Sequence, residues 1–345
     1  MSLTDIKNMN LHDIQSICAA QGLPVYVSKQ IFEWIYVKSI RKFSLMSNIS
    51  KNFRDYLENN FYISQLPVLE SIKSADKTTK FLFSVSNKNT IETVLIEEKN
   101  RKTLCISTQV GCKYRCAFCV SGTAGFLGNL ETSHIVNQFM EVGNLIKPDR
   151  LTNLVFMGIG EPLDNFDNLI KAIQIIKDKQ GIGLGKRKIT VSTCGISPMI
   201  RRLADLRTDI NLTVSLHSAN DKIRSQLMPV NIEHSLRSLI MALKYFVKAE
   251  GYPVTFEYIL IKGVNCSAKD AIELANYANG VPHKINLIPY NVSSYFKWKP
   301  PSAYETSCFT DVLKKRNILY TIRKSKGQNI NASCGQLMAN LKNYT

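Results

Sequence analysis

The stretch Cys112-Lys113-Tyr114-Arg115-Cys116-Ala117-Phe118-Cys119 places three cysteines on one short turn, in the pattern CxxxCxxC. The turn follows the apolar run Thr103 to Ser107, and Gly122, Gly125 and Gly128 allow close backbone approach behind it. Three thiolates at this spacing can surround one small inorganic centre. The pattern therefore predicts a metal or cluster site around which the rest of the chain is organised.

Two kinds of centre bind cysteine thiolates in this way. Structural zinc needs four ligands, and the nearest downstream candidate, His134, lies outside ordinary spacing, so zinc would require a remote fourth ligand. An iron–sulfur cluster held by three cysteines leaves one iron open for a substrate or cofactor. Three buried and inert cysteines are the remaining alternative. The spacing favours the iron–sulfur cluster.

Length and composition indicate a globular protein. The chain has 345 residues, of which 45% are hydrophobic, enough for one large domain with additions. Residues 1–10 lack the apolar stretch of a signal peptide, and no apolar run is long enough to span a bilayer. We therefore expect a cytoplasmic protein with no membrane contact, in which nine cysteines serve metal or redox chemistry.

The net charge of the chain favours nucleic acid as a binding partner. Lysine and arginine number 44 against 27 acidic residues, a net charge of +17. No acidic residue follows Asp311, whereas several basic residues do: Lys314, Lys315, Arg316, Arg323, Lys324, Lys326 and Lys342.

The first 60 residues predict a small helical module. We expect helices over 11–20, 28–37 and 50–59, the last two capped by Ser28 and Ser50. Six basic residues of this module either bind phosphate or form a solvated face: Lys29, Lys38, Arg41, Lys42, Lys51 and Arg54.

Short strands are expected next, over 80–84, 90–96 and 103–107. Glu92 is an acid within an otherwise β-branched and apolar run. It is either a solvent-facing strand residue or a partly desolvated acid–base group.

From residue 103 onward the pattern alternates strand and helix, which predicts a parallel sheet with right-handed crossovers. The expected strands are 103–107, 153–157, 188–192, 211–215, 255–261 and 284–288, and the expected helices 133–146, 167–179, 198–206, 235–249 and 268–278. In parallel barrels the active site lies at the carboxyl ends of the strands. Polar and glycine-rich segments recur there: 158–162, 192–194, 215–218, 262–265 and 289–291.

The tail contains a second cysteine of interest, Cys334, among small residues inside the region that has only basic charges. A thiol near cations is a candidate nucleophile, and a small buried cysteine is the alternative.

Together these motifs resemble the RlmN/Cfr family of radical S-adenosylmethionine (SAM) RNA methyltransferases, along essentially the whole chain. The resemblance rests on the cysteine turn, Cys105 seven residues before it, and four further motifs: Gly160-Glu161-Pro162, Ser215-Leu216-His217, Leu227-Met228-Pro229-Val230-Asn231 and Ala332-Ser333-Cys334-Gly335-Gln336-Leu337. It implies an α/β fold, a partial (β/α)6 radical SAM barrel with a small N-terminal helical domain and a β extension. The implied divisions are a helical RNA-binding domain (1–65), the β extension (66–102), the barrel (103–302) and a C-terminal segment with a methyl-carrier cysteine (303–345).

Within the family the sequence is similar to the RlmN branch, which methylates carbon 2 of an adenine in 23S ribosomal RNA and in some transfer RNAs. The Cfr branch methylates carbon 8 of the same ribosomal adenine and usually has Ala where Pro162 stands here. Carbon-8 methylation is the first alternative. A non-enzymatic RNA-binding protein stabilised by zinc is the second.

The resemblance assigns roles residue by residue. Cys112, Cys116 and Cys119 would bind a 4Fe–4S cluster. The implied SAM contacts are Gly160, Glu161, Ser192, Ser215, Leu216, His217 and Asn291.

Three further residues carry the implied chemistry, which consumes two SAM molecules per turnover. Cys334 becomes S-methylcysteine, and a deoxyadenosyl radical then removes hydrogen from that methyl group so that it adds to adenine. Glu92 would accept the ring proton, and Cys105 would form a disulfide with Cys334 that frees the product. Cys18, Cys194, Cys266 and Cys308 would be structural.

The implied partners are 23S rRNA and tRNA, an external electron donor and a disulfide reductant, and we expect a monomer. Tyr295-Phe296-Lys297-Trp298-Lys299 interleaves aromatic and cationic residues and is either an RNA contact or a hydrophobic cover over the barrel end.

Overall fold

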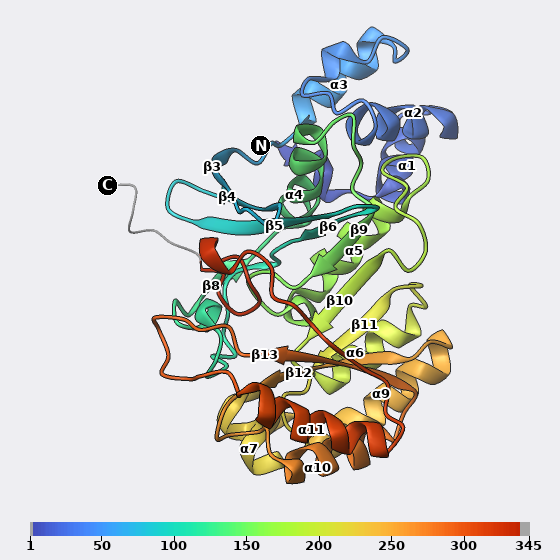
Figure 1. Ribbon diagram of the computed structural model, residues 1–345. Helices are drawn as coiled ribbons and strands as arrows, with labels where there is room; N and C mark the ends of the chain where they lie inside the picture. Colours follow the sequence, from blue (N-terminus) through green and yellow to red (C-terminus); the bar gives the residue numbers. More distant parts are fainter. Residues whose placement is uncertain (1–2, 339–345) are drawn as a thin grey trace.

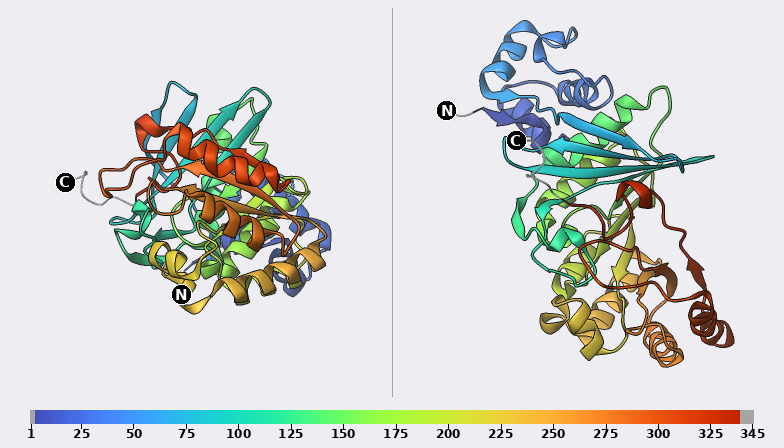
Figure 2. Two further views of the ribbon diagram at one scale, coloured as in Figure 1. Left: turned by 60° about the horizontal axis from the view of Figure 1, so that its bottom comes forward. Right: turned by 60° about the vertical axis from the view of Figure 1, so that its left-hand side comes forward.

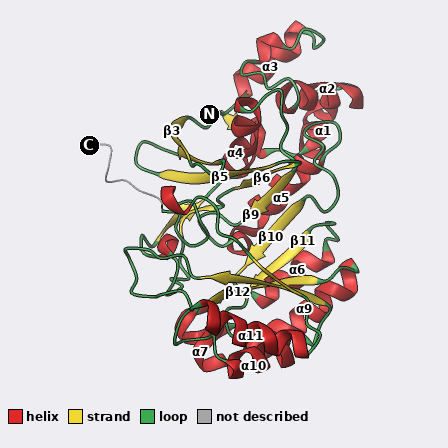
Figure 3. Cartoon of the chain, in the orientation of Figure 1, coloured by secondary structure: helices red, strands yellow, loops and turns green. Residues whose placement is uncertain are grey.

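The computed structural model describes residues 3–338, so Lys342, one of the basic residues noted in the tail, lies outside the described part. Its centre is a ten-stranded sheet in the order β14-β13-β12-β11-β10-β9-β6-β5-β4-β3 (Figure 1). Helices pack on one side of this sheet, and the C-terminal segment crosses the other side (Figures 1 and 3).

Seven adjacent strands of the sheet are parallel to one another. They are β6 (Arg101–Cys105), β9 (Asn153–Phe156), β10 (Ile189–Thr193), β11 (Asn211–Ser215), β12 (Val254–Leu260), β13 (His283–Pro289) and β14 (Tyr320–Ile322). The first six are the strands expected from the alternating pattern, within two residues at each end, so the predicted parallel α/β fold is confirmed. The short β14 was missed because its three residues show no buried alternation.

The antiparallel strands β3 (Val68–Lys73), β4 (Thr78–Ser84) and β5 (Thr90–Glu98) continue the sheet beyond β6. Helices connect the parallel strands: α4 (Thr132–Leu145), α5 (Phe166–Lys177), α6 (Ser197–Asp205), α9 (Leu236–Glu250) and α10 (Ala268–Ala278), with α11 (Ala303–Lys315) before β14. The short helices α7 (Asp221–Leu227) and α8 (Val230–Glu233) lie between β11 and α9. The apolar faces of all these helices pack against the sheet and form the main core.

The N-terminal module consists of α1 (Leu11–Ala20), α2 (Val25–Tyr36) and α3 (Lys51–Asn60), tied by the parallel pair β1 (Thr4–Asp5) and β2 (Phe61–Tyr62). It lies at the end of the molecule opposite α11 (Figure 2). Ser50 caps α3 as expected. The prediction that Ser28 caps α2 was wrong, because the helix starts after Pro24 and the Ser28 hydroxyl donates to the Val25 carbonyl.

The two faces of the sheet bury different residues, as the alternation of side chains along a strand requires. Leu95 on β5 and Leu104 on β6 face the helices and belong to the main core. Val94 and Cys105 face the other way, into a small apolar cluster that includes Leu337 from the C-terminal segment. That inner face is where the predicted site residues gather.

None of the helices between residues 3 and 338 is both long and apolar enough to cross a membrane.

Candidate active site

The cysteine turn is held in place from several directions. It follows β7 (Gln109–Gly111), which pairs with β8 (Phe126–Asn129), rather than β6 directly as expected. The Cys112 amide donates to the Gly125 carbonyl at 2.9 Å. The Ala117 amide donates to the Leu227 carbonyl at 2.9 Å, and the Ala117 carbonyl accepts from the Trp298 indole at 2.9 Å. The turn therefore has a fixed conformation before anything binds to it.

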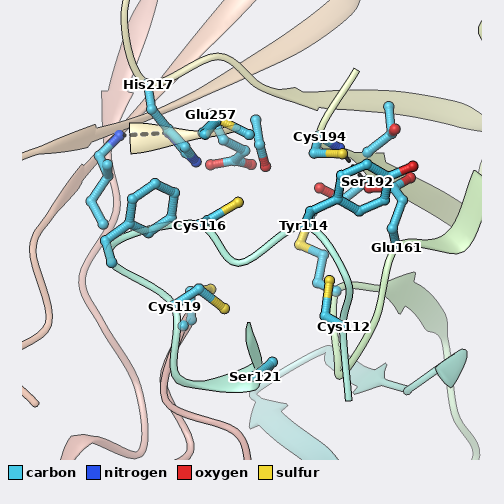
Figure 4. A pocket seen from close by; sticks show the side chains of 18 of the residues that line it. Cys112, Tyr114, Cys116, Cys119, Ser121, Glu161, Ser192, Cys194, His217 and Glu257 are labelled. Atoms are coloured by element: carbon cyan, nitrogen blue, oxygen red, sulfur yellow. Dashed lines mark hydrogen bonds between the residues drawn. The ribbon is translucent and has the colours of Figure 1, made fainter. Parts of the chain in front are cut away.

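The three cysteines of the turn line one cavity with groups from the strand ends (Figure 4). All three thiols are free. Burial raises the pKa of Cys112 to about 12 and also raises the pKa of Cys116 and Cys119. A thiol in such surroundings loses its proton when a metal takes the proton's place. Three convergent cysteines beside open space suit an iron–sulfur cluster with one open iron.

Between residues 3 and 338, no group of three or more His, Cys, Asp or Glu side chains is arranged to hold a single metal ion.

The Gly160–Glu161 turn presents its backbone to the cavity. Gly160 has φ of +101°, and a Cβ there would lie 2.5 Å from the Gln109 Cβ, so glycine is required. The buried Glu161 carboxylate accepts from the Cys194 amide at 2.7 Å and the Leu163 amide at 3.0 Å. Burial raises the pKa of Glu161, whereas these hydrogen bonds lower it. Glu161 thus joins two strand-end loops of the cavity wall.

Ser192, Ser215 and His217 also line the cavity. The His217 Nδ1 accepts from the Ile259 amide at 3.0 Å, so the neutral ring carries its proton on Nε2. Burial lowers the pKa of His217 to about 3. The ring also packs edge-on against Phe118, with centroids 4.7 Å apart. His217 is therefore a neutral hydrogen-bond donor toward the cavity.

Two of the seven predicted SAM contacts do not line the cavity: Leu216 and Asn291. Leu216 is fully buried behind it. The Asn291 side chain donates to the Cys334 carbonyl at 3.2 Å and accepts from the Gln328 side chain at 3.0 Å. In this structure Asn291 positions the C-terminal segment.

That segment brings Cys334 to the cavity although it lies 215 positions after Cys119 in the chain. The Val120 amide donates to the Gly335 carbonyl at 2.8 Å, and the Ser121 hydroxyl donates to the Leu337 carbonyl at 2.8 Å. Cys334 itself is exposed and its thiol is free. The predicted methyl carrier thus lies beside the predicted cluster ligands.

Cys105 and Glu92 lie behind this segment rather than on the cavity wall. Cys105 shares its apolar cluster with Ala332 and Leu337. Burial, and secondarily Cys334, raises the pKa of Cys105 to about 12. Glu92 is buried on the same face of the sheet, and the Met338 amide donates to its carboxylate at 2.8 Å.

Sequence reasoning missed three charged residues at the site. Arg224 is fully buried and donates to the carbonyls of Leu216 (3.1 Å) and Cys194 (2.7 Å), so it ties two loops together. Glu257 and Arg323 line the cavity. An acid within an apolar strand, the signal that singled out Glu92, would have found Glu257 as well. The Cys194 thiol, expected to be structural, lines the cavity too.

The aromatic and cationic stretch 295–299 divides into two parts. Trp298 packs against the core and holds the cysteine turn, as a cover would. Tyr295 is exposed, and its hydroxyl donates to the Met338 sulfur at 3.1 Å.

Both the sequence and the fold of this chain match known radical SAM proteins. Residues 106–275 match the Radical SAM superfamily, and residues 4–63 match the ribosomal RNA large subunit methyltransferase N-terminal domain. The structure of a radical SAM methyltransferase from Sphaerobacter thermophilus superposes with a TM-score of 0.90 and 36% sequence identity, covering 97% of this chain and 99% of that one. The fold and the site thus define a radical SAM protein.

Similar proteins that have names show which radical SAM family this chain belongs to. A probable dual-specificity RNA methyltransferase RlmN from Spiroplasma citri is 40% identical, over 98% of both chains. The dual-specificity RNA methyltransferase RlmN from Pelobacter propionicus is 40% identical, over 98% of this chain and 96% of that one. The chain belongs to the RlmN family of radical SAM RNA methyltransferases, which confirms the resemblance seen in its motifs. Membership implies a 4Fe–4S cluster and SAM as cofactors.

Proposed function

We propose that this protein methylates carbon 2 of an adenine in 23S rRNA and in tRNA, with Cys334 as the carrier of the methyl group. The observation that carries the proposal is the position of Cys334, which lies in one cavity with the three cysteines of the CxxxCxxC turn. A nucleophilic thiol beside a radical-generating centre suits a reaction that first loads a methyl group and then activates it.

Carbon 2 of adenine is electron-poor and does not attack a methyl cation donor, so a radical route is required. A 4Fe–4S cluster held by Cys112, Cys116 and Cys119, with SAM on its open iron, would supply the adenosyl radical. The residues that would bind SAM are those implied by the family. Gly160, Glu161, Ser192, Ser215 and His217 line the cavity and support this proposal, whereas Leu216 and Asn291 do not line it and rest on the resemblance alone.

The chain's own residues then divide the remaining work. Cys334 accepts a methyl group by displacement and presents it, after hydrogen is removed, to the adenine. Glu92 accepts the ring proton, a task that requires a carboxylate within hydrogen-bond reach of the substrate. An external electron carrier takes up the unpaired electron of the adduct. The Cys105 thiolate then attacks the sulfur of Cys334, so that an S–S bond forms as the S–CH2 bond breaks, and the methylene carbon keeps the electron pair and takes up a proton to become the methyl group of the released base. An external reductant restores the two thiols.

The target adenine must be unstacked to reach a buried site, which favours an opened or single-stranded RNA segment. The basic residues of the N-terminal module (1–65) and the C-terminal segment (303–345) would hold the RNA backbone. We propose that the protein works as a monomer in the cytoplasm with an external electron donor.

The reaction is tested by nucleoside mass spectrometry. RNA from cells that lack the modification is incubated anaerobically with reconstituted protein, SAM and a reductant. The proposal predicts 2-methyladenosine in both rRNA and tRNA. The appearance of 8-methyladenosine instead would favour the Cfr-type alternative, and Pro162 in place of the usual Ala argues against that outcome. No methylated adenosine despite an intact cluster would overturn the proposal.

A further inference from the structure

Glu92 faces a physical conflict if it is to accept a proton. Its side chain is buried, and burial raises the pKa of the carboxyl. A carboxyl that is already protonated cannot accept the proton of adenine. A neighbouring group that stabilises the ionised form would oppose this effect of burial.

Lys80 is placed to do this by the register of two antiparallel strands. Lys80 on β4 pairs with Val94 on β5, so it is the diagonal neighbour of Glu92 on the same face of the sheet. The Lys80 Nζ lies 2.9 Å from the Glu92 Oε1, and the two side chains are only 15% and 10% exposed. At such exposure solvent screens the attraction much less than in a surface pair.

The two oxygens of Glu92 have different kinds of partner. Oε1 is held by Lys80, which is anchored in the sheet. Oε2 accepts from the Met338 amide at 2.8 Å, and Met338 belongs to the segment that carries Cys334. A movement of that segment would free Oε2 while leaving Oε1 in place.

Among the charged groups of residues 3–338 that act on Glu92, Lys80 favours the ionised form, and Glu70 on β3 opposes it. The hydrogen bond from Met338 also lowers the pKa of Glu92. When Met338 moves away, the ion pair with Lys80 still stabilises the ionised form.

We propose that Lys80 is a positioning residue that fixes Oε1 of Glu92 and keeps the carboxylate ionised, so that Oε2 accepts the proton from carbon 2 of the adenine. This inference rests on the proposed function. In the step, the C2–H bond breaks, its electron pair stays with the purine adduct, and the proton forms a new O–H bond on Oε2. Glu92 becomes a neutral carboxylic acid, while the ammonium of Lys80 keeps its proton.

The first test measures the carboxyl directly and needs no turnover. Isotope-edited infrared spectroscopy of the full-length reconstituted protein follows protonation of Glu92, whose signal is assigned by its loss in Glu92→Gln. Lys80→Met is expected to move protonation of Glu92 to higher pH, and Lys80→Arg to restore a titration close to that of the wild type. The matched control is Lys73→Met. Lys73 lies on β3 of the same sheet, its side chain is exposed, and the substitution removes its ion pair with Glu97.

The second test follows a single turnover across pH. Lys80→Met is expected to form product at least about tenfold more slowly at neutral pH and to recover as the pH rises, since a general base contributes about 10²- to 10⁴-fold. Loading of the methyl group onto Cys334 should stay unchanged in the same variant. Should Lys80→Met fail to fold, Lys80→Gln keeps a donor to Oε1 without the charge.

An unchanged Glu92 titration and an unchanged pH profile in Lys80→Met would overturn the inference while leaving the proposed function intact. A wild-type protein that makes no methyladenosine would overturn the function on which the inference rests. The infrared titration and the product assay therefore separate the two failures.

Discussion

The cavity has two walls that are built in different ways. One wall comes from the ends of parallel strands and the cysteine turn, and buried groups such as Arg224 and Glu161 hold it together. The other wall is the C-terminal segment, where Cys334 is exposed and hydrogen bonds from distant parts of the chain, including Val120, Ser121 and Asn291, hold the backbone.

The difference fits a division of labour in the proposed reaction. Generation of a radical needs a rigid centre that excludes water, and in the strand-end wall the buried Arg224 and Glu161 side chains are hydrogen-bonded to neighbouring loops. A methyl carrier must meet first a methyl donor and then an RNA base, so it needs freedom to move. In the C-terminal segment the thiol of Cys334 is exposed, although the backbone on either side of it is hydrogen-bonded to distant parts of the chain.

The largest effects should come from the rigid wall. Cys116→Ala removes one of three cluster ligands, so we expect loss of the 4Fe–4S cluster, of SAM cleavage and of RNA methylation together. Iron content, the visible absorption of the cluster and release of 5′-deoxyadenosine measure these three properties. A matched control is Cys308→Ala on α11, away from the cavity, which should leave all three unchanged.

Cys334→Ala should separate the functions of the two walls, namely methyl transfer and radical generation. Methylation is expected to fall below detection because the carrier sulfur is gone, whereas the cluster and SAM cleavage survive. The same assays apply, with nucleoside analysis of the RNA. Normal methylation by this variant would remove Cys334 from the mechanism.

Gly160→Ala tests the rigidity of the strand-end wall. The new Cβ would meet Gln109 at a backbone φ that only glycine adopts freely, and we expect a loss of about 1–3 kcal/mol in unfolding free energy together with weaker SAM binding. Thermal unfolding and calorimetric titration with SAM measure the two effects. Gly128→Ala on β8, where a Cβ has open space, is the control.

The buried histidine predicts a pH effect on stability. The pKa of His217 in the folded chain, about 3, lies below the ordinary value of 6.5, so between these values the unfolded chain binds the extra proton. Stability should therefore fall as the pH drops below 6.5, with a slope from this residue of at most about 1.4 kcal/mol per pH unit.

His217→Asn should make that fall shallower, because Asn keeps an acceptor for the Ile259 amide and tolerates the positive φ of this position. Denaturant unfolding at a series of pH values measures the slope. His12→Asn at an exposed position should leave it unchanged, and an equal slope for His217→Asn and the wild type would contradict the assignment.

The smallest effect should come from loosening the second wall. Ser121→Ala removes the hydrogen bond to the Leu337 carbonyl, worth about 0.5–1.5 kcal/mol. We expect faster hydrogen exchange at the Met338 amide and little change in global stability. Unchanged exchange at Met338 would mean that the hydrogen bond from Ser121 does not restrain the segment.

The same two walls explain what the sequence could predict. The strand-end wall follows from local patterns: six strands and Gly160-Glu161-Pro162 lie where periodicity and motifs placed them, whereas the cysteine turn follows the unexpected β7. The three cysteines, Ser192, Ser215 and His217 meet because parallel strands end at one edge of the sheet.

The second wall could not be derived in this way. Its contacts, such as Met338 with Glu92, join residues far apart in the chain, and no periodicity reports them. Arg224 was missed because its partners are backbone carbonyls, which have no sequence signature. The role of Cys334 was predicted from the family resemblance. Its local sequence alone was equally compatible with a buried, inert cysteine.

The central claim is that the methyl group passes through Cys334 on its way to carbon 2 of adenine. The most direct measurement uses SAM with a fully deuterated methyl group, followed by peptide mass spectrometry of the protein and nucleoside mass spectrometry of the RNA. The account predicts the intact label on Cys334 and 2-methyladenosine that has lost one deuteron from the transferred group. A product that keeps every deuteron, or a Cys334 that never carries the label, would contradict it.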